Sequence, residues 1–499
     1  MRSILVAIAI ICGWLTLAAE AQAQRWHSVE TTGFTVFAEG SERRAVEVAD
    51  NLEEFDSLLR RMTGAPAERS PTKLQVYLFS TGQFEEAFSY LGNNIAGVYV
   101  ARSERIAAYS IFSPNSGLGS QDTLFHEYAH HFMYQYFNNA YPAWYIEGFA
   151  EVVSTAALGT QRVVIGRANE GRVRDLRGGA WIPMERLLTA TPFQIDGSDR
   201  SMYYAQAWLF AHYLLLTPGA NTQFLTYVRA LRTGRDPMEA FQEGFGVTPE
   251  QMQSTLSLYL RGNPNAIALG RPAHVATPQM DVSTLPPSAD RLMAISGRLF
   301  SGFIRDDDKA TLLARIRQLA GPEPYDDFAL LTVARAEIRL GSTETARTLL
   351  EPYLATHTDS RDGLYLMGLA YLREADDARG EPRTALLSQA RRYLGRGYRL
   401  DGNYVPTLVR YAETYAGEPM DDATYENYVN ILLLARQLAP QVGEISLNAA
   451  HVLLRAHRVR EAIPILRALA YDPHAGGGAE AAQRLLAEAE AELAGSHAN

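Results

Sequence analysis

Three residues that can bind and use a divalent metal ion lie close together in the segment QDTLFHEYAHHFMYQYF. His126, Glu127 and His130 form the pattern His-Glu-x-x-His. Residues four positions apart share one face of an α-helix, so the two imidazoles can converge on one ion. Glu127 is rotated to the side, where its carboxylate can reach a water without being a ligand. The pattern predicts metal-assisted hydrolysis with Zn²⁺, because neutral imidazole nitrogens suit that ion.

A third ligand for this ion is available further along the chain. A zinc site that catalyses hydrolysis needs three protein ligands and an open position for water. The segment PAWYIEGFAEVV supplies Glu147 from a second predicted helix, which begins near Pro142. Glu151 lies one turn beyond Glu147, where its carboxylate can accept a hydrogen bond from the outer nitrogen of a ligating imidazole. We therefore expect one zinc ion, held by His126, His130 and Glu147.

The two motifs HEYAH and WYIEGFAE resemble those of the gluzincin metallopeptidases, in particular the peptidase MA-like family of exported bacterial proteins. The resemblance covers roughly residues 97–260. It implies a zincin-like fold, hydrolysis of peptide bonds, zinc ligands at His126, His130 and Glu147, and Glu127 as the general base. The spacing from the second histidine to the glutamate is slightly shorter than in thermolysin-like and aminopeptidase-N-like members.

A pair of tyrosines further on carries the resemblance to a second catalytic role. The segment YYAQAWLF is similar to a helix of aminopeptidase-like gluzincins, in which a tyrosine near the start stabilises the oxyanion. Tyr204 fits that position by register, because Ala207 then takes the place of a small residue. Tyr203 is the alternative, and a tyrosine that only packs on the core is another.

The segment before HEYAH bears on the kind of substrate. It contains no counterpart of the GAMEN-like motif with which aminopeptidases anchor a free amine, so endo- and exopeptidase activity both stay open. In its place stands GVYVARSERIAAY, which can form an exposed edge strand that pairs with an extended peptide. Two further histidines, His131 and His212, are expected to pack or lie at the surface rather than bind metal.

The elements that must position these residues follow from hydrophobic spacing. Strand-like segments lie at 34–39, 73–79 and 97–110, and a helical pattern lies at 43–61. Helical patterns dominate beyond Gly119, with a strand-like interruption at 160–168. This order predicts an α+β domain over residues 24–262, and the resemblance to gluzincins implies that it is zincin-like and catalytic.

The C-terminal part of the chain has a different pattern. Prolines crowd the stretch 263–289, which indicates an interdomain linker. From 290 to 495 the pattern is helical throughout, and the segments FALLTVARAEIRLGSTETARTLL and NAAHVLLRAHRVREAIPIL place small alanines at the same spacing. Two antiparallel helices per unit resemble tetratricopeptide repeats, with an irregular helical bundle as the alternative. We expect an all-α repeat domain, separable from the catalytic domain, that binds the substrate or a protein partner.

The first 23 residues have the three parts of a secretory signal peptide, namely Arg2, an apolar run from Ile4 to Leu17, and a small-x-small site ending at Ala23. The run is shorter than the ~20 residues of a spanning helix, and an uncleaved anchor is the alternative. Cleavage would leave no membrane span and no cysteine, because Cys12 is the sole cysteine. The sequence predicts export, to the periplasm in a double-membraned bacterium and otherwise out of the cell.

Charge and the remaining motifs narrow the function. The chain of 499 residues has 46 Lys and Arg against 56 Asp and Glu, a net charge of −10, which argues against nucleic acid as a partner. No Gly-x-Ser-x-Gly nucleophile motif occurs. We therefore expect an exported zinc-dependent peptidase that acts on a peptide or protein. A repeat scaffold with an inactive metallopeptidase-like module and a zinc hydrolase of non-peptide amides are the alternatives.

Overall fold

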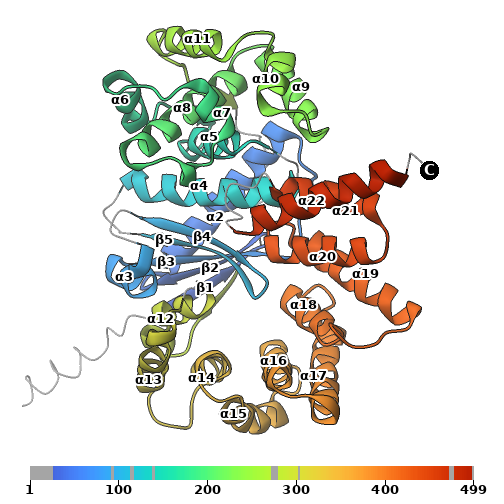
Figure 1. Cartoon of the computed structure of the whole chain (residues 1–499). Helices are drawn as coiled ribbons and strands as arrows, with labels where there is room; N and C mark the ends of the chain where they lie inside the picture. Colours follow the sequence, from blue (N-terminus) through green and yellow to red (C-terminus); the bar gives the residue numbers. More distant parts are fainter. Residues whose placement is uncertain are drawn as a thin grey trace, which may run out of the picture.

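The computed structural model describes two regions, a sheet-and-helix region followed by helical repeats (Figure 1). The described residues are 26–91, 95–112, 117–137, 141–270, 279–301, 304–470 and 477–496. The predicted signal peptide at 1–23, with Cys12, lies outside them. No helix within the described ranges is long and apolar enough to cross a membrane.

A six-stranded sheet forms the base of the first region, in the order β4-β5-β3-β2-β1-β9. Its strands are β1 (Trp26–Glu30), β2 (Phe34–Glu39), β3 (Leu74–Phe79), β4 (Gly97–Arg102), β5 (Arg105–Ile111) and β9 (Asp281–Thr284). Strands β2, β3 and β5 are parallel, while β4 runs antiparallel to β5 at one edge. The strands predicted at 34–39 and 73–79 are confirmed, and the segment 97–110 forms a hairpin with β4 as an edge strand.

Two helices on one face of the sheet set the position of the HEYAH motif. Helix α2 (Glu42–Thr63) confirms the helical pattern at 43–61 and ends at Gly64, whose φ of 71° is the left-handed conformation that glycine adopts easily. Helix α4 (Gly117–Tyr136) carries the motif. The rings of Phe55 and Phe125 stack 4.0 Å apart, and the Tyr128 hydroxyl donates to Asp56 Oδ1 at 2.5 Å. These contacts fix α4 against α2.

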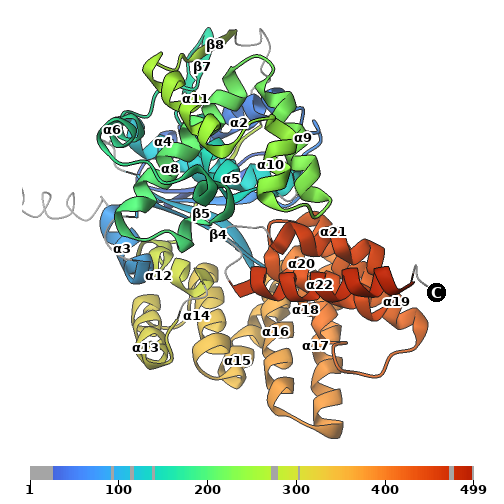
Figure 2. The same cartoon turned by 45° about the horizontal axis from the view of Figure 1, so that its top comes forward.

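A group of helices follows α4 and covers the HEYAH motif from the other side (Figures 1 and 2). They are α5 (Ala143–Ser154), α6 (Glu170–Gly178), α7 (Met184–Thr189), α8 (Gly197–Leu216), α9 (Ala220–Arg232), α10 (Pro237–Phe245) and α11 (Pro249–Arg261). Helices α5 and α8 cross closely at Gly148, where an added Cβ would lie only 2.2 Å from the carbonyl oxygen of Ala207. Glycine at this crossing brings the helix of Glu147 next to the helix of Tyr204.

The stretch 263–289, expected to be a linker, contributes strands to two sheets. A small sheet has the order β6-β7-β8, from Ala157–Leu158, Arg162–Ile165 and Ile267–Gly270. Strand β7 confirms the strand-like segment at 160–168. Strand β8 pairs with β7, and β9 pairs with β1. Both β8 and β9 are only four residues long and exposed, so they lack the apolar alternation by which a strand is recognised in sequence.

The C-terminal region consists of stacked antiparallel helices. They are α12 (Ala289–Ser301), α13 (Lys309–Ala320), α14 (Asp327–Leu340), α15 (Thr343–Thr356), α16 (Arg361–Asp377), α17 (Gly380–Leu400), α18 (Val405–Glu413), α19 (Asp422–Leu438), α20 (Gly443–Arg455), α21 (Val459–Ala470) and α22 (Gly477–Ser496). The predicted small residues Ala334, Ala346, Ala450 and Ala462 are buried. Gly368 packs on Leu394, whose Cγ would lie 2.5 Å from an added Cβ. The expected helical-repeat architecture is thus present.

The repeat region curves around the sheet region and contacts it at several places (Figures 1 and 2). Helix α12 packs in the apolar cluster of Trp26 on the second face of the sheet. Ser70 donates to the carbonyl oxygen of Leu438 at 3.3 Å, and Glu104 in the β4–β5 turn pairs with Arg335 at 2.9 Å. Removing the repeats would expose this apolar surface and leave a buried acid unpaired. The separability of the repeat domain stays a prediction, and this packing shows what a shortened chain would lose.

Candidate metal centre

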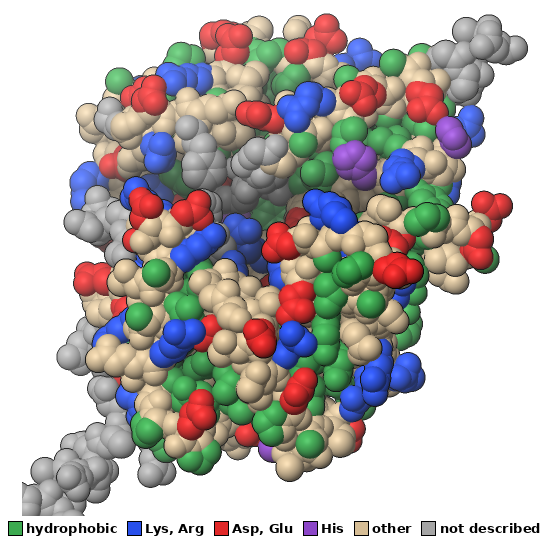
Figure 3. Space-filling view, turned by 60° about the horizontal axis from the view of Figure 1, so that its bottom comes forward, with side chains coloured by type: hydrophobic (Ala, Val, Ile, Leu, Met, Phe, Trp, Pro, Cys, Tyr) green, Lys and Arg blue, Asp and Glu red, His purple; other side chains and the backbone are tan. Residues whose placement is uncertain are grey.

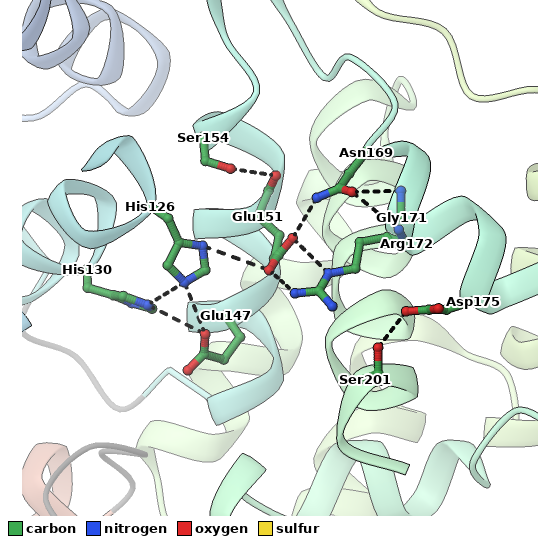
Figure 4. A network of polar contacts seen from close by, with 10 residues as sticks. All are labelled: His126, His130, Glu147, Glu151, Ser154, Asn169, Gly171, Arg172, Asp175 and Ser201. Atoms are coloured by element: carbon green, nitrogen blue, oxygen red, sulfur yellow. Dashed lines mark hydrogen bonds and ion pairs between the residues drawn. The ribbon is translucent and has the colours of Figure 1, made fainter. Parts of the chain in front are cut away.

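The fold brings together the three predicted ligands from helices α4 and α5 (Figure 4). His126 Nε2 lies 3.1 Å from His130 Nε2, and these atoms lie 3.7 and 3.5 Å from Glu147 Oε2. Neighbouring ligand atoms of a tetrahedral zinc ion, with bonds of ~2.0–2.1 Å, are about 3.3 Å apart. The three atoms therefore have the spacing of three corners of such a tetrahedron. The group could hold a metal ion.

The burial and charge of this cluster favour a cation. Glu147 and His130 are only 1% and 4% exposed. Burial lowers the pKa of His126, but its interaction with Glu147 and the charges of Glu151 and Glu127 outweigh burial and raise it to about 9. Without a metal, His126 thus holds a proton that offsets the surrounding carboxylates. A divalent cation among the same atoms would replace that proton, as ligand imidazoles must be neutral.

Glu151 faces the outer ring nitrogen of His126, Nδ1, while Glu147 faces Nε2 (Figure 4). Its Oε1 is 3.9 Å from His126 Nδ1, which is ion-pair proximity and longer than a hydrogen bond. Arg172 binds both carboxylate oxygens, with Nη2 2.6 Å from Oε1 and Nε 3.1 Å from Oε2, and Asn169 Nδ2 donates to Oε2 at 3.3 Å. This bidentate clamp fixes a charged acceptor next to the outer nitrogen of His126.

The clamp on Glu151 is the part of the site that sequence reasoning missed. Asn169 caps helix α6, because its side chain accepts from the backbone N–H groups of Gly171 and Arg172. The order Asn-Glu-Gly-Arg is a recognisable helix start, so the helix itself was open to prediction. Nothing in that signal says that the first turn of α6 faces α5.

The predicted base, Glu127, lies between helix α4 and the edge strand β4. An added Cβ on Gly97, the first residue of β4, would lie 3.4 Å from Glu127 Cγ and 2.6 Å from Thr123 Cγ2. Glycine therefore lets the strand approach the helix at this point. The carboxylate of Glu127 lies beside the start of the sheet edge, near enough to His126 for its charge to raise the pKa of that imidazole.

The two candidate tyrosines of α8 have different surroundings. Tyr203 is fully buried, and its hydroxyl donates to the carbonyl oxygen of Ala190 at 3.1 Å. Tyr204 is half-buried, with the guanidinium of Arg172 5.1 Å from its ring centroid. Burial and the charge of Glu147 raise the pKa of Tyr204, so its hydroxyl keeps its proton at neutral pH. Burial and Glu147 raise the pKa of Tyr203 as well, so the two tyrosines differ mainly in that the Tyr203 hydroxyl is engaged within the core, and the role of Tyr204 stays a prediction.

The other two histidines singled out in the sequence are packing residues. The Nδ1 atom of His131 lies 3.1 Å from the Tyr99 hydroxyl, and burial lowers the pKa of His131 to about 4. Both ring nitrogens of His212 are engaged, with the Tyr259 hydroxyl and the carbonyl oxygen of Gly166, each at 2.9 Å. Neither histidine belongs to the ligand group around Glu147.

Comparison with known proteins adds little. No protein-family model matches the sequence. No curated protein matches it either. Among solved structures, the chain is similar to a thermophilic TPR protein of Thermus thermophilus, with 21% identity over 37% of this chain and 91% of that chain and a TM-score of 0.31. At this identity and TM-score the match says nothing about activity.

Proposed function

We propose that this chain is a zinc-dependent peptidase of the gluzincin type, with a zincin-like catalytic region. The observation that supports the proposal most strongly is the tetrahedral spacing of His126, His130 and Glu147, with Glu127 beside them. Structural zinc sites are closed by four protein ligands, whereas catalytic sites use three and keep one position open. Among the described residues, the ligand group consists of these three.

The residues around the site divide the proposed reaction among them. A zinc ion held there would supply Lewis-acid activation of a water and of the substrate carbonyl. The carboxylate of Glu127 accepts a proton from the attacking water and delivers it to the nitrogen of the leaving amine. The Tyr204 hydroxyl donates a hydrogen bond to the carbonyl oxygen as that oxygen gains negative charge. Glu151, clamped by Arg172, keeps the outer nitrogen of His126 protonated and the ring in place.

A peptide is the proposed substrate because the site lies next to a sheet edge. Strand β4 ends the sheet, and none of the described strands pairs with its outer side. Such an edge presents backbone N–H and C=O groups that can pair with an extended peptide. Glu127 beside Gly97 places the base at the start of this edge. A peptide bound along β4 would therefore run past Glu127, next to the ligand group.

Export is part of the proposal and rests on the sequence of residues 1–23. A protein without its signal segment would hold its fold by core burial alone, since no cysteine would remain. The periplasm is the proposed compartment if the source is a double-membraned bacterium. Fractionation of cells that express the full chain, with sequencing of the mature N-terminus, tests both export and cleavage after Ala23.

The alternative function is a helical-repeat scaffold whose metallopeptidase-like region is inactive. The stacked helix pairs favour it, because such surfaces bind segments of other proteins. A scaffold, however, gives no role to Glu127 beside an ordered ligand set. Incubation of the zinc-loaded protein with a mixed peptide library, with and without a chelator, separates the two functions. Chelator-sensitive products in mass spectra support the peptidase, and an unchanged library contradicts it, which would leave the scaffold or a hydrolase of non-peptide amides.

A further inference from the structure

A cavity of about 530 Å³ lies where the β4–β5 hairpin meets the concave side of the helical repeats. The strand end contributes Arg102, and the turn contributes Ser103 and Glu104. The repeats contribute side chains from α12, α14, α16, α17, α18 and α20. Figure 3 shows the molecule from the side of the repeats, where both basic and acidic side chains border a hollow in the surface.

Basic side chains are in excess within this cavity. The arginines that line it are Arg102, Arg339, Arg373, Arg383 and Arg410. The most enclosed acid, Glu104, is already paired with Arg335 at 2.9 Å and Arg410 at 3.7 Å, and Arg410 also contacts Glu413. These pairs tie the hairpin to the repeats. Two further acids line the cavity, Asp376, which pairs with Arg373 at 3.3 Å, and Glu444, which accepts a hydrogen bond from Ser103 at 3.4 Å. Arg383 pairs with Glu418 at 3.4 Å, just outside the lining.

Arg339 is the arginine that the pairing leaves out. Its guanidinium donates to the carbonyl oxygen of Leu299, and within the described part of the chain no carboxylate lies at ion-pair distance from it. Burial lowers the pKa of Arg339, and the attraction of Glu104 is offset by the like charges of Arg335 and Arg102. A half-buried cation among other cations is stabilised by an added anion. The cavity is therefore suited to a carboxylate that the protein itself does not supply.

The place of the cavity relative to the metal centre indicates where that carboxylate comes from. Strand β4 starts with Gly97 beside Glu127 and ends with Arg102 in the cavity wall. Five steps along a strand at ~3.4 Å each cover about 17 Å. A peptide that pairs with the outer edge of β4 and has one residue at the metal would carry its fifth residue from there into the cavity.

We propose that this arginine cavity recognises an acidic side chain of the peptide substrate, about five residues from the scissile bond. The inference rests on the proposed peptidase function and adds a substrate class to it. The volume of the cavity, about 530 Å³, is in the range of protein pockets that bind ligands, so an acidic side chain fits inside. The carboxylate pairs with Arg339 inside the cavity, and the backbone of the same peptide pairs with β4.

The test measures peptide binding in the absence of turnover. Zinc-loaded full-length Glu127→Gln protein is titrated with labelled, otherwise neutral twelve-residue peptides. An Asp-Asp pair stands five residues before or five residues after a central hydrophobic residue, and matched peptides carry Asn-Asn at the same places. Fluorescence anisotropy at low salt should show at least tenfold tighter binding of one Asp-Asp peptide over its Asn-Asn match. In the same background, Arg339→Gln should reduce this preference to within twofold.

Matched variants keep the result independent of folding. Arg102→Gln changes an exposed residue at the cavity mouth and should also weaken the preference, while Arg484→Gln on exposed α22 should leave it intact. Zinc content and thermal unfolding verify that each variant is folded. Equal binding of Asp-Asp and Asn-Asn peptides at both placements overturns the proposal. So does a preference that survives both cavity substitutions.

Further outcomes distinguish this inference from a site for small anions and from the peptidase proposal. Free glutarate that binds as tightly as the Asp-Asp peptide would make the cavity a site for small anions and overturn the peptide assignment. Cleavage of the peptide library without any preference for acidic peptides overturns this inference but supports the peptidase proposal. An uncleaved library together with an Arg339-dependent preference sinks the peptidase proposal, and the cavity is then a binding site for acidic peptides.

Discussion

The metal centre and the arginine cavity lie at opposite ends of the edge strand β4, and they favour ions of opposite charge. At the metal centre, Glu127 and Glu147 lie beside two imidazoles, while Glu151 is already paired with Arg172, and the ligand group favours a cation. In the cavity, Arg339 lies near like charges and has no carboxylate at ion-pair distance among the described residues, which favours an anion. The metal centre is built on two neighbouring helices, while the cavity joins a hairpin to six helices far along the chain. The metal ligands thus follow from spacing along the chain, whereas the cavity forms only through packing between distant parts of the chain.

The largest expected effect comes from Glu127→Gln at the metal centre. The amide has nearly the same shape as the carboxylate but cannot accept a proton, so catalysis should fall by ~10²–10⁴-fold. Zinc content should stay unchanged, because Glu127 is not among the ligands. Steady-state cleavage of the best library peptide, with elemental analysis of the same samples, checks both parts. A variant that cleaves at the wild-type rate would show that Glu127 is not the base.

Tyr204→Phe should lower kcat by ~10²–10³-fold with little change in KM, because its hydroxyl acts on charge that develops only in the transition state. Tyr203→Phe is the matched control. It removes a bond to the carbonyl oxygen of Ala190 and should reduce thermal stability while kcat stays near wild type. If Tyr203→Phe alone lowers kcat, the oxyanion donor is the other tyrosine and the register on α8 is wrong.

Arg172→Met tests the difference between Arg172, which holds the carboxylate of Glu151, and Arg339, which is proposed to bind a carboxylate of the substrate. Without the bidentate clamp, Glu151 loses its fixed place behind His126, and zinc affinity should fall by ~10–100-fold. Arg339→Met removes an arginine of the cavity and should leave zinc affinity unchanged. Competition with a fluorescent chelator measures both. Equal zinc affinity in the Arg172 variant and wild type would remove the positioning role from Arg172.

A further effect concerns stability rather than activity, through pH and the packing histidine next to the site. His131 has a folded pKa of about 4, below its unfolded value of ~6.5, so the unfolded chain binds its proton first. This contribution to stability is complete above pH ~6.5 and is lost as pH falls toward 4, at about 1.4 kcal/mol per pH unit. His131→Gln should flatten the acid limb of the stability curve relative to wild type. Urea unfolding of metal-free protein at several pH values tests this, and parallel acid limbs would contradict it.

What the sequence could predict depends on how far apart the contributing residues lie. Local periodicity was enough to predict the helix with HEYAH, the strands around it and the small residues of the repeats. The structure contains all of these elements. The clamp of Arg172 on Glu151 depends on how α6 turns toward α5, which no local pattern encodes. Strands β8 and β9 were not predicted, because they are short, exposed and flanked by prolines. The same prolines suggested a linker, and with it a separable repeat domain. The ion pair of Glu104 with Arg335 joins the two regions, and their separability stays a prediction.

The central claim is that His126, His130 and Glu147 bind one zinc ion, and its most direct test is the zinc content of adjacent histidine variants. His130 belongs to the ligand group, whereas His131, one residue on, packs on Tyr99. Elemental analysis of wild type, His130→Ala and His131→Gln, each purified in limiting zinc, compares the two positions directly. The account predicts about one zinc per chain in wild type and His131→Gln and close to none in His130→Ala. Equal zinc in all three proteins would contradict it.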